Sequence, residues 1–285
     1  MDVGIGLPST ITDVTGDRLT EWARRADSAG FSTLGTIDRL VYDNYEPLLA
    51  LAAAAAVTER IRLTTSVLLA PLRISAPTLA KQAATLQHLS GGRFVLGTAI
   101  GGREDDHEAA GVPMKERAKR FEAMIDELKA IWSRSAPGAK AGIGPNVSAN
   151  PPKLIIGGGA DAVYPRAAQA DGWIMGGGTP DQFAQGRDKL LAAWREAGRE
   201  GEPYAGALAY FSLGPDAAAN AQAQIGGYYE WLGEYAQMVV DSVAKDEGTV
   251  RAYVQGFADA GCDELIFFPA SSDPEQVDLL AGAAL

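Results

Sequence analysis

Short apolar runs alternate with longer amphipathic segments along the whole chain. The apolar runs are rich in β-branched residues and are bounded by turn-forming residues, which is typical of β-strands. The segments between them carry apolar residues at helical spacing, as in Phe121, Met124, Ile125 and Leu128. The pattern therefore predicts eight strands, at residues 3–7, 32–37, 61–69, 93–98, 153–156, 172–175, 205–213 and 263–268.

A helix is expected after each predicted strand. Gly30 stands just beyond a helical segment, where glycine favours the end of a helix, and Pro47 and Pro77 stand where proline favours a first turn. The predicted helices cover residues 17–29, 47–58, 77–89, 114–132, 160–170, 180–198 and 274–280, with further helical segments between 213 and 260. Eight strands, each followed by a helix, predict an α/β protein with a single (β/α)₈ TIM barrel, because a doubly wound open sheet has fewer strands and a switch point.

Composition narrows the class of protein without changing this fold. The length suits one barrel, and residues 135–152, rich in Gly, Pro, Ser and Asn, are interpreted as a loop within one domain that spans residues 1–285. A formal net charge of −11 without a basic run argues against a nucleic acid partner. The longest apolar stretch, residues 48–57, is too short for a bilayer and no secretory signal is recognisable, so we expect a cytoplasmic protein with a small-molecule substrate.

The cysteine and histidine residues exclude several kinds of chemistry. Cys262 is the sole cysteine, so no internal disulfide forms, and its place at the entrance of a strand favours a buried structural thiol. The two histidines, His88 and His107, belong to no ligand pair, which argues against a metal site. A serine hydrolase is disfavoured because the sequence has no G-x-S-x-G motif.

Two glycine triplets carry the clearest candidate chemistry. The first follows the fifth predicted strand and the second follows the sixth, and each stands directly before a helix: Gly157, Gly158 and Gly159, then Gly176, Gly177 and Gly178. Glycine lets backbone N–H groups approach a ligand, and a helix start adds partial positive charge, so two such loops predict a clamp for one phosphate. A single triplet would be explained equally by a tight turn. Thr179 would either contact the phosphate or cap its helix.

Active sites of barrels of this type lie on the loops that follow the strands. Asp38 and Arg39 follow the second strand, and Arg103 begins a charged run after the fourth. Most of that run is expected to be solvated surface, and Asp38 and Arg103 are as compatible with surface as with the site. Hydroxyl residues at 64–66 leave room for a flat ring, although strand packing explains them equally well.

An ordered set of motifs carries a family resemblance. The segments are Gly4–Pro8, Ala29–Phe31, Thr58–Leu63 with Thr65–Val67, Leu89–Phe94 with Leu96–Gly97, Glu108–Pro113 with Arg117–Glu122, Pro151–Gly158 and Ala170–Trp173. In this order they resemble the luciferase-like monooxygenase superfamily, which includes FMN-dependent monooxygenases and reductases that use the deazaflavin coenzyme F420. The C-terminal part of the chain matches only in its general alternation of elements.

The resemblance implies a TIM barrel with an isoalloxazine-type ring in its mouth. In such proteins the residues that match Ser66 and Val67 often form a non-proline cis peptide against the ring. Thr98 matches a position near the ring or the ribityl chain, and the two glycine triplets match the phosphate site. The implied cofactor is therefore FMN or, alternatively, coenzyme F420.

Three positions depart from the family pattern. Many relatives carry a catalytic histidine where this chain has Arg39, and arginine, which stays charged, cannot act as a general base. Arg39 would instead bind an anionic substrate or stabilise a reduced, negatively charged flavin. Relatives often have aspartate in place of His88 and an aromatic residue near Gly102. The catalytic candidates are therefore Asp38, Arg39 and Arg103.

Three functions remain open at this level. The first hypothesis is an FMN-dependent monooxygenase that transfers one oxygen atom to a small organic substrate. The second is hydride transfer with F420, whose acidic tail would favour a line of basic residues leading away from the phosphate loops. Lys153, Arg166 and Arg187 are expected to be scattered near this end of the barrel, which does not decide between the cofactors. The third is a non-catalytic flavin-binding homologue. This hypothesis remains open because Arg39 replaces the catalytic histidine of many relatives.

Two further expectations concern the substrate pocket and assembly. The pocket would be lined by residues 135–150 and 225–235, where Tyr228, Tyr229 and Trp231 cluster, although such aromatics are more often core. Relatives are commonly dimers, and the small-residue face of Leu49–Ala56 predicts a homodimer, although it would pack on its own barrel equally well.

Overall fold

The strands form a closed parallel barrel. The computed structural model describes all residues from 1 to 285, with strands β1 (Asp2–Gly6), β2 (Thr33–Thr36), β3 (Arg62–Thr65), β4 (Leu68–Leu69), β5 (Phe94–Ala99), β6 (Lys153–Gly157), β7 (Gly172–Met175), β8 (Tyr204–Phe211) and β9 (Glu264–Pro269). Their order is β3-β2-β1-β9-β8-β7-β6-β5-β4, and a pairing of β3 with β5 closes the ring. Because only Ser66 and Val67 separate β3 from β4, these two strands share one of eight positions. The predicted (β/α)₈ barrel is confirmed.

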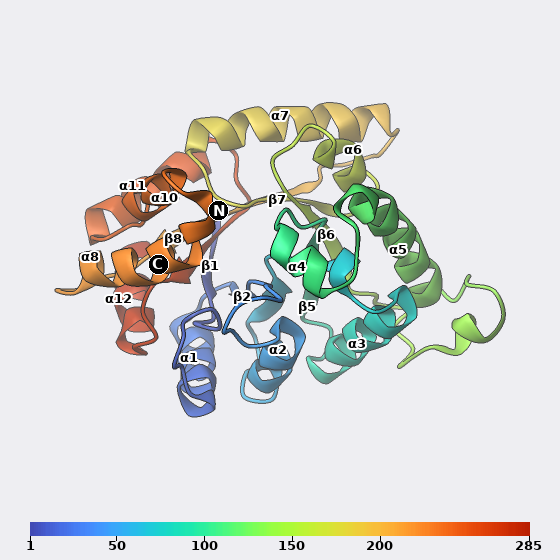
Figure 1. The fold of residues 1–285 in the computed structure, drawn as a ribbon, viewed down its shortest axis with the longest axis horizontal. Helices are drawn as coiled ribbons and strands as arrows, with labels where there is room; N and C mark the ends of the chain where they lie inside the picture. Colours follow the sequence, from blue (N-terminus) through green and yellow to red (C-terminus); the bar gives the residue numbers. More distant parts are fainter.

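Helices surround this barrel in the order of the chain (Figure 1). They are α1 (Gly16–Ala29), α2 (Pro47–Ala55), α3 (Ala76–Leu89), α5 (Arg117–Trp132), α6 (Val163–Ala167), α7 (Pro180–Glu196), α11 (Glu247–Asp259) and α12 (Glu275–Ala284). Short 3₁₀ turns lie at Ala70–Leu72, Met114–Glu116 and Gly138–Gly142. The predicted helices are found, but α6 is much shorter than expected. No helix has both the length and the apolar character needed to cross a bilayer.

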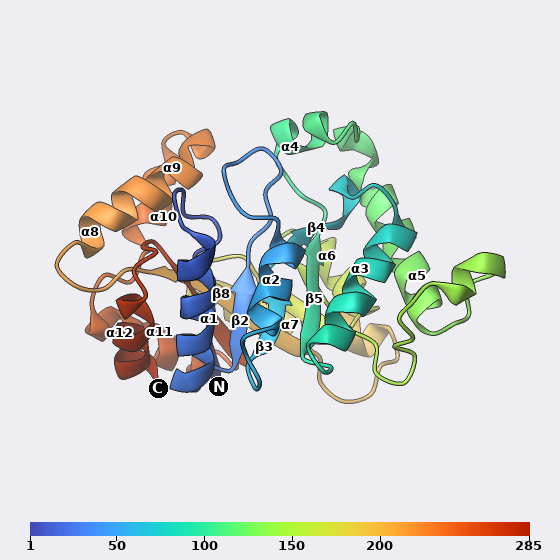
Figure 2. The ribbon, with the colours of Figure 1, turned by 90° about the horizontal axis from the view of Figure 1, so that it is seen from below.

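Additional helices lie over the carboxyl ends of the strands. After β8 the chain forms α8 (Ala217–Asn220), a π-helical turn at Ala221–Ile225, α9 (Gly226–Tyr228), a 3₁₀ turn at Glu230–Leu232 and α10 (Tyr235–Asp241). The helix α4 (Glu104–Ala109) follows β5; the sequence did not predict it, because its acidic residues indicate a solvated loop. Figure 2 shows α4 and α9 at one end of the molecule and both termini at the other.

Alternation along the strands divides the apolar residues between two cores. On β1, Val3 and Ile5 point outward into the core between barrel and helices, whereas Gly4 and Gly6 face inward. The inner core is filled mainly from β6 to β9, by residues such as Leu208, Ile266 and Phe268. A Cβ atom at Gly6 would lie 2.2 Å from the ring of Phe268, so this aromatic side chain occupies the space that glycine leaves.

Helix α2 packs mostly on its own barrel. Leu48, Ala50, Leu51, Ala54 and Ala55 are buried, which is the alternative that the sequence left open for this small-residue segment. Its outward positions include Leu49, whose side chain is exposed. The barrel contact accounts for the buried alanines, whereas Ala53 and Ala56 are exposed beside Leu49, and the homodimer stays a prediction.

Gly97 on β5 offers a direct test of the barrel packing. A Cβ atom there would lie 2.0 Å from the backbone oxygen of Thr65, so Gly97→Ala forces the two strands apart. We expect this substitution to lower the free energy of unfolding by about 1–3 kcal/mol, as overpacking does. Urea denaturation followed by circular dichroism measures the change.

Gly282→Ala is the matched control, because nothing lies within 4 Å of a Cβ atom at that position of α12. Alanine in a helix is favoured over glycine by about 0.5–1 kcal/mol, so this variant should be more stable than the parent chain. Equal stability of the two variants would contradict the packing described here.

Cys262 is buried at the start of β9, as the sequence predicted, and its thiol donates a hydrogen bond to the backbone oxygen of Glu264 at 3.1 Å. Burial raises the pKa of this thiol to about 12, so it stays protonated at neutral and mildly alkaline pH. Because the thiolate is the reactive form, we expect the folded chain at pH 8 to react with a disulfide reagent on the order of a thousandfold more slowly than the urea-unfolded chain. Equal rates before and after unfolding would show that the thiol is accessible.

Candidate functional site

Buried polar atoms without a partner gather at the carboxyl ends of the strands. Ten buried side-chain nitrogen or oxygen atoms lack a hydrogen-bond partner. All but those of Trp22 and Arg117 belong to residues at or beyond the ends of β1 to β5, namely Ser9, Thr36, Arg39, Ser66, Arg73, Arg103 and both ring nitrogens of His107. Buried polar groups are normally paired, so this concentration indicates that the mouth of the barrel is built to hold a polar ligand.

A cis peptide joins Ser66 to Val67 between β3 and β4, as the family resemblance implied. The side chain of Val67 lies over β6, where a Cβ atom at Gly157 would come within 2.7 Å of its Cγ1. Thr98, fully buried on β5, donates to the backbone oxygen of Leu68 at 2.8 Å and holds β4 beside β5. Ser66, Val67, Thr98 and Gly157 therefore form one continuous wall.

The two glycine triplets lie side by side, because β6 and β7 are neighbours in the barrel. The amide of Gly158 donates to the backbone oxygen of Ile174 at 3.3 Å, and the indole of Trp173 donates to the backbone oxygen of Gly158 at 2.7 Å. Gly158, Gly177 and Gly178 have φ angles of 133°, 103° and 134°, which favour glycine. The loops are thus fixed in shape by their backbone.

A cavity of about 300 Å³ lies between these loops, with Gly159 and Gly177 in its wall and Lys189 at its edge. Gly176, Gly177 and Gly178 are exposed, so their amides are open to a ligand. Thr179 caps α7: its hydroxyl accepts from the amide of Gln182 at 3.3 Å, and the side chain of Gln182 accepts from the amide of Thr179 at 2.9 Å. Of the two roles open for Thr179, the structure shows capping. An anion between the loops would meet open amides and the positive end of a 17-residue helix.

Asp38 is buried beside the wall that contains the cis peptide. Its carboxylate accepts a hydrogen bond from the amide of Leu69 at 2.8 Å and forms an ion pair with Arg73. Through Leu69, the side chain of Asp38 therefore holds β4 against the loop that follows β2. Both contacts are made by Oδ2 alone, and the catalytic role expected for Asp38 stays a prediction.

Arg39 is held in a buried ion pair. Its Nε donates to Asp106 at 3.0 Å, and its Nη2 donates to the backbone oxygen of Val41 at 2.8 Å. The guanidinium carbon lies 5.3 Å from the ring centre of Tyr42 and 5.5 Å from that of Tyr228, within cation–π distance. One terminal nitrogen, Nη1, has no partner.

Asp106 is the important residue that the sequence did not reveal. It is fully buried on α4 and also accepts from the amides of Leu40 and Val41, at 3.0 and 2.6 Å. It belongs to the charged run of which most was expected to be solvated surface. Asp106 is an exception, because the helix turns its side chain toward Arg39. The signal in the sequence that could have identified Asp106 is the run of acidic residues that follows Gly101 and Gly102 and forms the short helix α4.

A chain of aromatic rings forms the opposite wall of the mouth. Tyr228 and Tyr229 pack edge to face with centres 5.0 Å apart, and the hydroxyls of Tyr229 and Tyr210 lie 2.8 Å apart. Burial raises the pKa of Tyr210, Tyr228 and Tyr229, so these hydroxyls stay protonated near neutral pH. Nearby, Arg103 forms an ion pair with Asp105 and lies 4.7 Å from the ring centre of the half-exposed Trp231.

Two expectations about position are wrong. Residues 135–150 do not line the mouth, because the backbone oxygen of Asn150 accepts from Gln87 near the far end of α3. Lys153 begins β6 and therefore lies at the opposite end of the barrel from the phosphate loops. Arg166 pairs with Glu122, and Arg187 pairs with Glu202.

Comparisons with known proteins agree with this architecture. The family model described as luciferase-like monooxygenase matches residues 1–262. An uncharacterized protein of Mycobacterium tuberculosis is 32% identical over 202 residues, which cover 60% of this chain and 67% of that protein. The F420-dependent glucose-6-phosphate dehydrogenase of Kribbella flavida is 27% identical over 213 residues, 69% of this chain and 63% of that enzyme.

A solved structure extends the likeness of the fold to the whole chain. The oxygenating constituent of 3,6-diketocamphane monooxygenase from Pseudomonas putida, in complex with FMN, has a TM-score of 0.77 at 17% identity and covers 100% of this chain and 96% of its own. At that identity the likeness shows the fold alone. Because the family model matches most of the sequence, this chain belongs to the luciferase-like monooxygenase family, whose members are flavin- or F420-dependent oxidoreductases.

Proposed function

We propose that this protein is an FMN-dependent monooxygenase that acts on a small organic substrate. The observation that carries the proposal is the placement of two open glycine loops beside the wall of Ser66, Val67 and Thr98, at one mouth of the barrel. A cofactor with one phosphate and one flat ring matches these two neighbouring features. The concentration of unpartnered polar atoms at the same mouth supports a ligand there.

The phosphate would be held by the backbone amide of Gly159 and those of residues 176–178, because the amide of Gly158 already donates to Ile174. The N-terminus of α7 would add positive potential. Lys189 lies at the edge of this cavity, with its ammonium 2.7 Å from the carboxylate of Asp161. The ring would pack against Ser66, Val67 and Thr98. When bound, the cofactor supplies the redox chemistry, while the protein supplies binding, orientation and exclusion of water.

Arg39 acts as a positioning residue in this proposal. Its charge is balanced by Asp106, so it is not a free cation waiting for an anionic substrate. It instead joins the loop after β2 to the aromatic wall through Tyr42 and Tyr228. These rings and the pair of Arg103 with Trp231 would exclude water from the mouth.

Charge near the phosphate loops favours FMN over F420. The acidic tail of F420 would require basic residues leading away from the loops, and Lys189, Arg166 and Arg187 are each paired with a carboxylate. Lys153 lies at the other end of the barrel. Hydride transfer with F420 is the second candidate, and the similarity to the Kribbella flavida enzyme favours it.

Binding of the two cofactors tests the proposal directly. We expect the purified chain to bind FMN and to bind F420 at least tenfold more weakly, as measured by isothermal titration calorimetry. Gly177→Val should weaken FMN binding about tenfold or more, equivalent to 1.4 kcal/mol, because a β-branched residue strains a backbone with φ of 103°.

Gly198→Val is the matched control, since Gly198 also has a positive φ, 68°, but lies beyond the C-terminus of α7. It should lower stability and leave FMN affinity unchanged. Tighter binding of F420 than FMN would replace the first candidate by the second. Loss of affinity in both variants alike would remove the glycine loops from the site.

The buried pair of Asp106 and Arg39 generates a second prediction. Asp106→Ala leaves the Arg39 guanidinium buried without its carboxylate and frees two backbone amides. Breaking a buried pair in this way costs about 3–5 kcal/mol, so the midpoint of urea denaturation should fall strongly.

Glu247→Ala is the control for this experiment, because Glu247 forms an exposed ion pair with Arg251 on the surface of α11. Exposed pairs contribute at most about 1 kcal/mol, and the midpoint should change little. A similarly small effect for Asp106→Ala would mean that water reaches the Arg39 pair.

A further inference from the structure

The barrel has a second opening at the end where its strands begin, opposite the mouth that contains the glycine loops. A cavity of about 530 Å³ reaches inward from this opening. Its lining includes inward-facing residues two apart on single strands, such as Arg62 and Thr64 on β3 and Lys153 and Ile155 on β6. The volume is within the usual range of about 300–1,000 Å³ for small-molecule pockets.

The inner part of this cavity is apolar. Val95, Ile155, Ile174 and Ile266 project into it from four different strands. Barrels of this type are normally filled by layers of branched side chains. Here such side chains form the floor, and the layer nearest the opening is hollow and polar.

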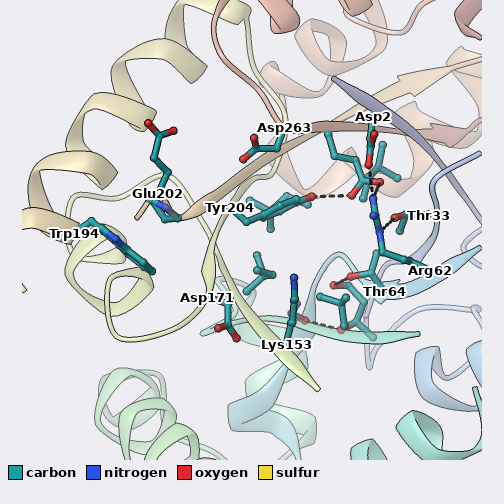
Figure 3. Close-up of a pocket in the computed structure, with 18 of the residues that line it drawn as sticks. Asp2, Thr33, Arg62, Thr64, Lys153, Asp171, Trp194, Glu202, Tyr204 and Asp263 are labelled. Atoms are coloured by element: carbon teal, nitrogen blue, oxygen red, sulfur yellow. Dashed lines mark hydrogen bonds and ion pairs between the residues drawn. The ribbon is translucent and has the colours of Figure 1, made fainter. Parts of the chain in front are cut away.

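One wall of the cavity is a fully paired polar network. Glu264 is buried and accepts hydrogen bonds from Ser32, from Arg62 at 2.9 Å and from the Tyr204 hydroxyl at 2.9 Å. Figure 3 shows Arg62 and Tyr204 in this wall. The Tyr204 ring lies flat over Gly206, where a Cβ atom would come within 2.4 Å of the hydroxyl oxygen. This wall therefore has no unsatisfied charge.

Lys153 differs from the other charged groups that line the cavity. Asp171 accepts the amide of Leu154 at 2.7 Å, and Asp263 accepts the amide of Ala205 at 2.8 Å. The remaining charged residues of the lining also have partners: Asp2, Arg62, Arg199, Glu202 and Glu264. Lys153 alone has neither a hydrogen bond nor an ion pair. Its side chain is exposed at the opening, and its amine points into the cavity (Figure 3).

We propose that this cavity is a binding site for a small aliphatic carboxylate, separate from the cofactor site at the mouth. The alkyl chain would lie among Val95, Ile155, Ile174 and Ile266, and the carboxylate would pair with Lys153. A carboxylate supplies the partner that Lys153 lacks. Glu264 already accepts from Arg62 and Tyr204, whereas Asp171 and Asp263 each accept only one backbone amide. An alkylammonium is therefore the competing ligand that the titration has to exclude.

Calorimetric titration of the full chain with butanoate, hexanoate and octanoate tests the site. Each added methylene buried in the cavity should tighten binding about fourfold, the ratio expected from transfer of a CH₂ group out of water. Lys153→Met, which keeps an unbranched apolar stem, should weaken octanoate binding about tenfold or more. Lys119→Met is the matched control, because Lys119 is exposed and also unpaired, and it should leave the affinity unchanged.

A second variant separates the cavity from other surfaces. Val95→Phe fills the apolar floor and should abolish octanoate binding, while saturating FMN should leave that binding unchanged because the mouth lies at the other end of the barrel. Three results would each overturn the proposal. They are octylammonium binding as tightly as octanoate, an unchanged affinity in Lys153→Met, and competition between FMN and octanoate. Absence of saturable binding at millimolar octanoate would overturn it as well.

Discussion

The uneven filling of the barrel interior is the constraint on which the other features depend. Glycines at inward positions leave room for large side chains, as Gly6 does for Phe268 of the neighbouring strand β9 and Gly206 for Tyr204 of its own strand β8. Gly157 in the same way lets Val67 lie against β6, beside the cis peptide. One end of the barrel is therefore shaped by glycine contacts around a ring-sized wall, and the other is left hollow.

Local patterns in the sequence were sufficient for the barrel and for the position of the two glycine loops. Alternation of apolar residues identifies all eight strand positions, and two glycine triplets after neighbouring strands identify loops that the fold then places together. The prediction works because a parallel barrel aligns the carboxyl ends of its strands. Residues 135–150 were misplaced because a loop without regular structure gives no local signal of the face on which it packs.

Long-range pairs could not be predicted in the same way. Arg39 and Asp106 are 67 positions apart, and nothing near either residue indicates that the other neutralises it. The acidic run around Asp106 has the composition of a solvated surface, and only the helix α4 turns one of its carboxylates inward. Lys153 likewise looked like a neighbour of the phosphate loops, although the length of β6 separates it from them.

The contacts of Arg39 with the adjoining rings of Tyr42 and Tyr228 have a consequence for the design of chimeras. It ties the loop after β2 to the helical excursion after β8, two segments that lie far apart in the chain and meet above the mouth. Transplanting the excursion from a relative would leave both Arg39 and Tyr42 without the ring of Tyr228 that they contact. The two segments therefore form one exchangeable unit, and recombination has to move them together.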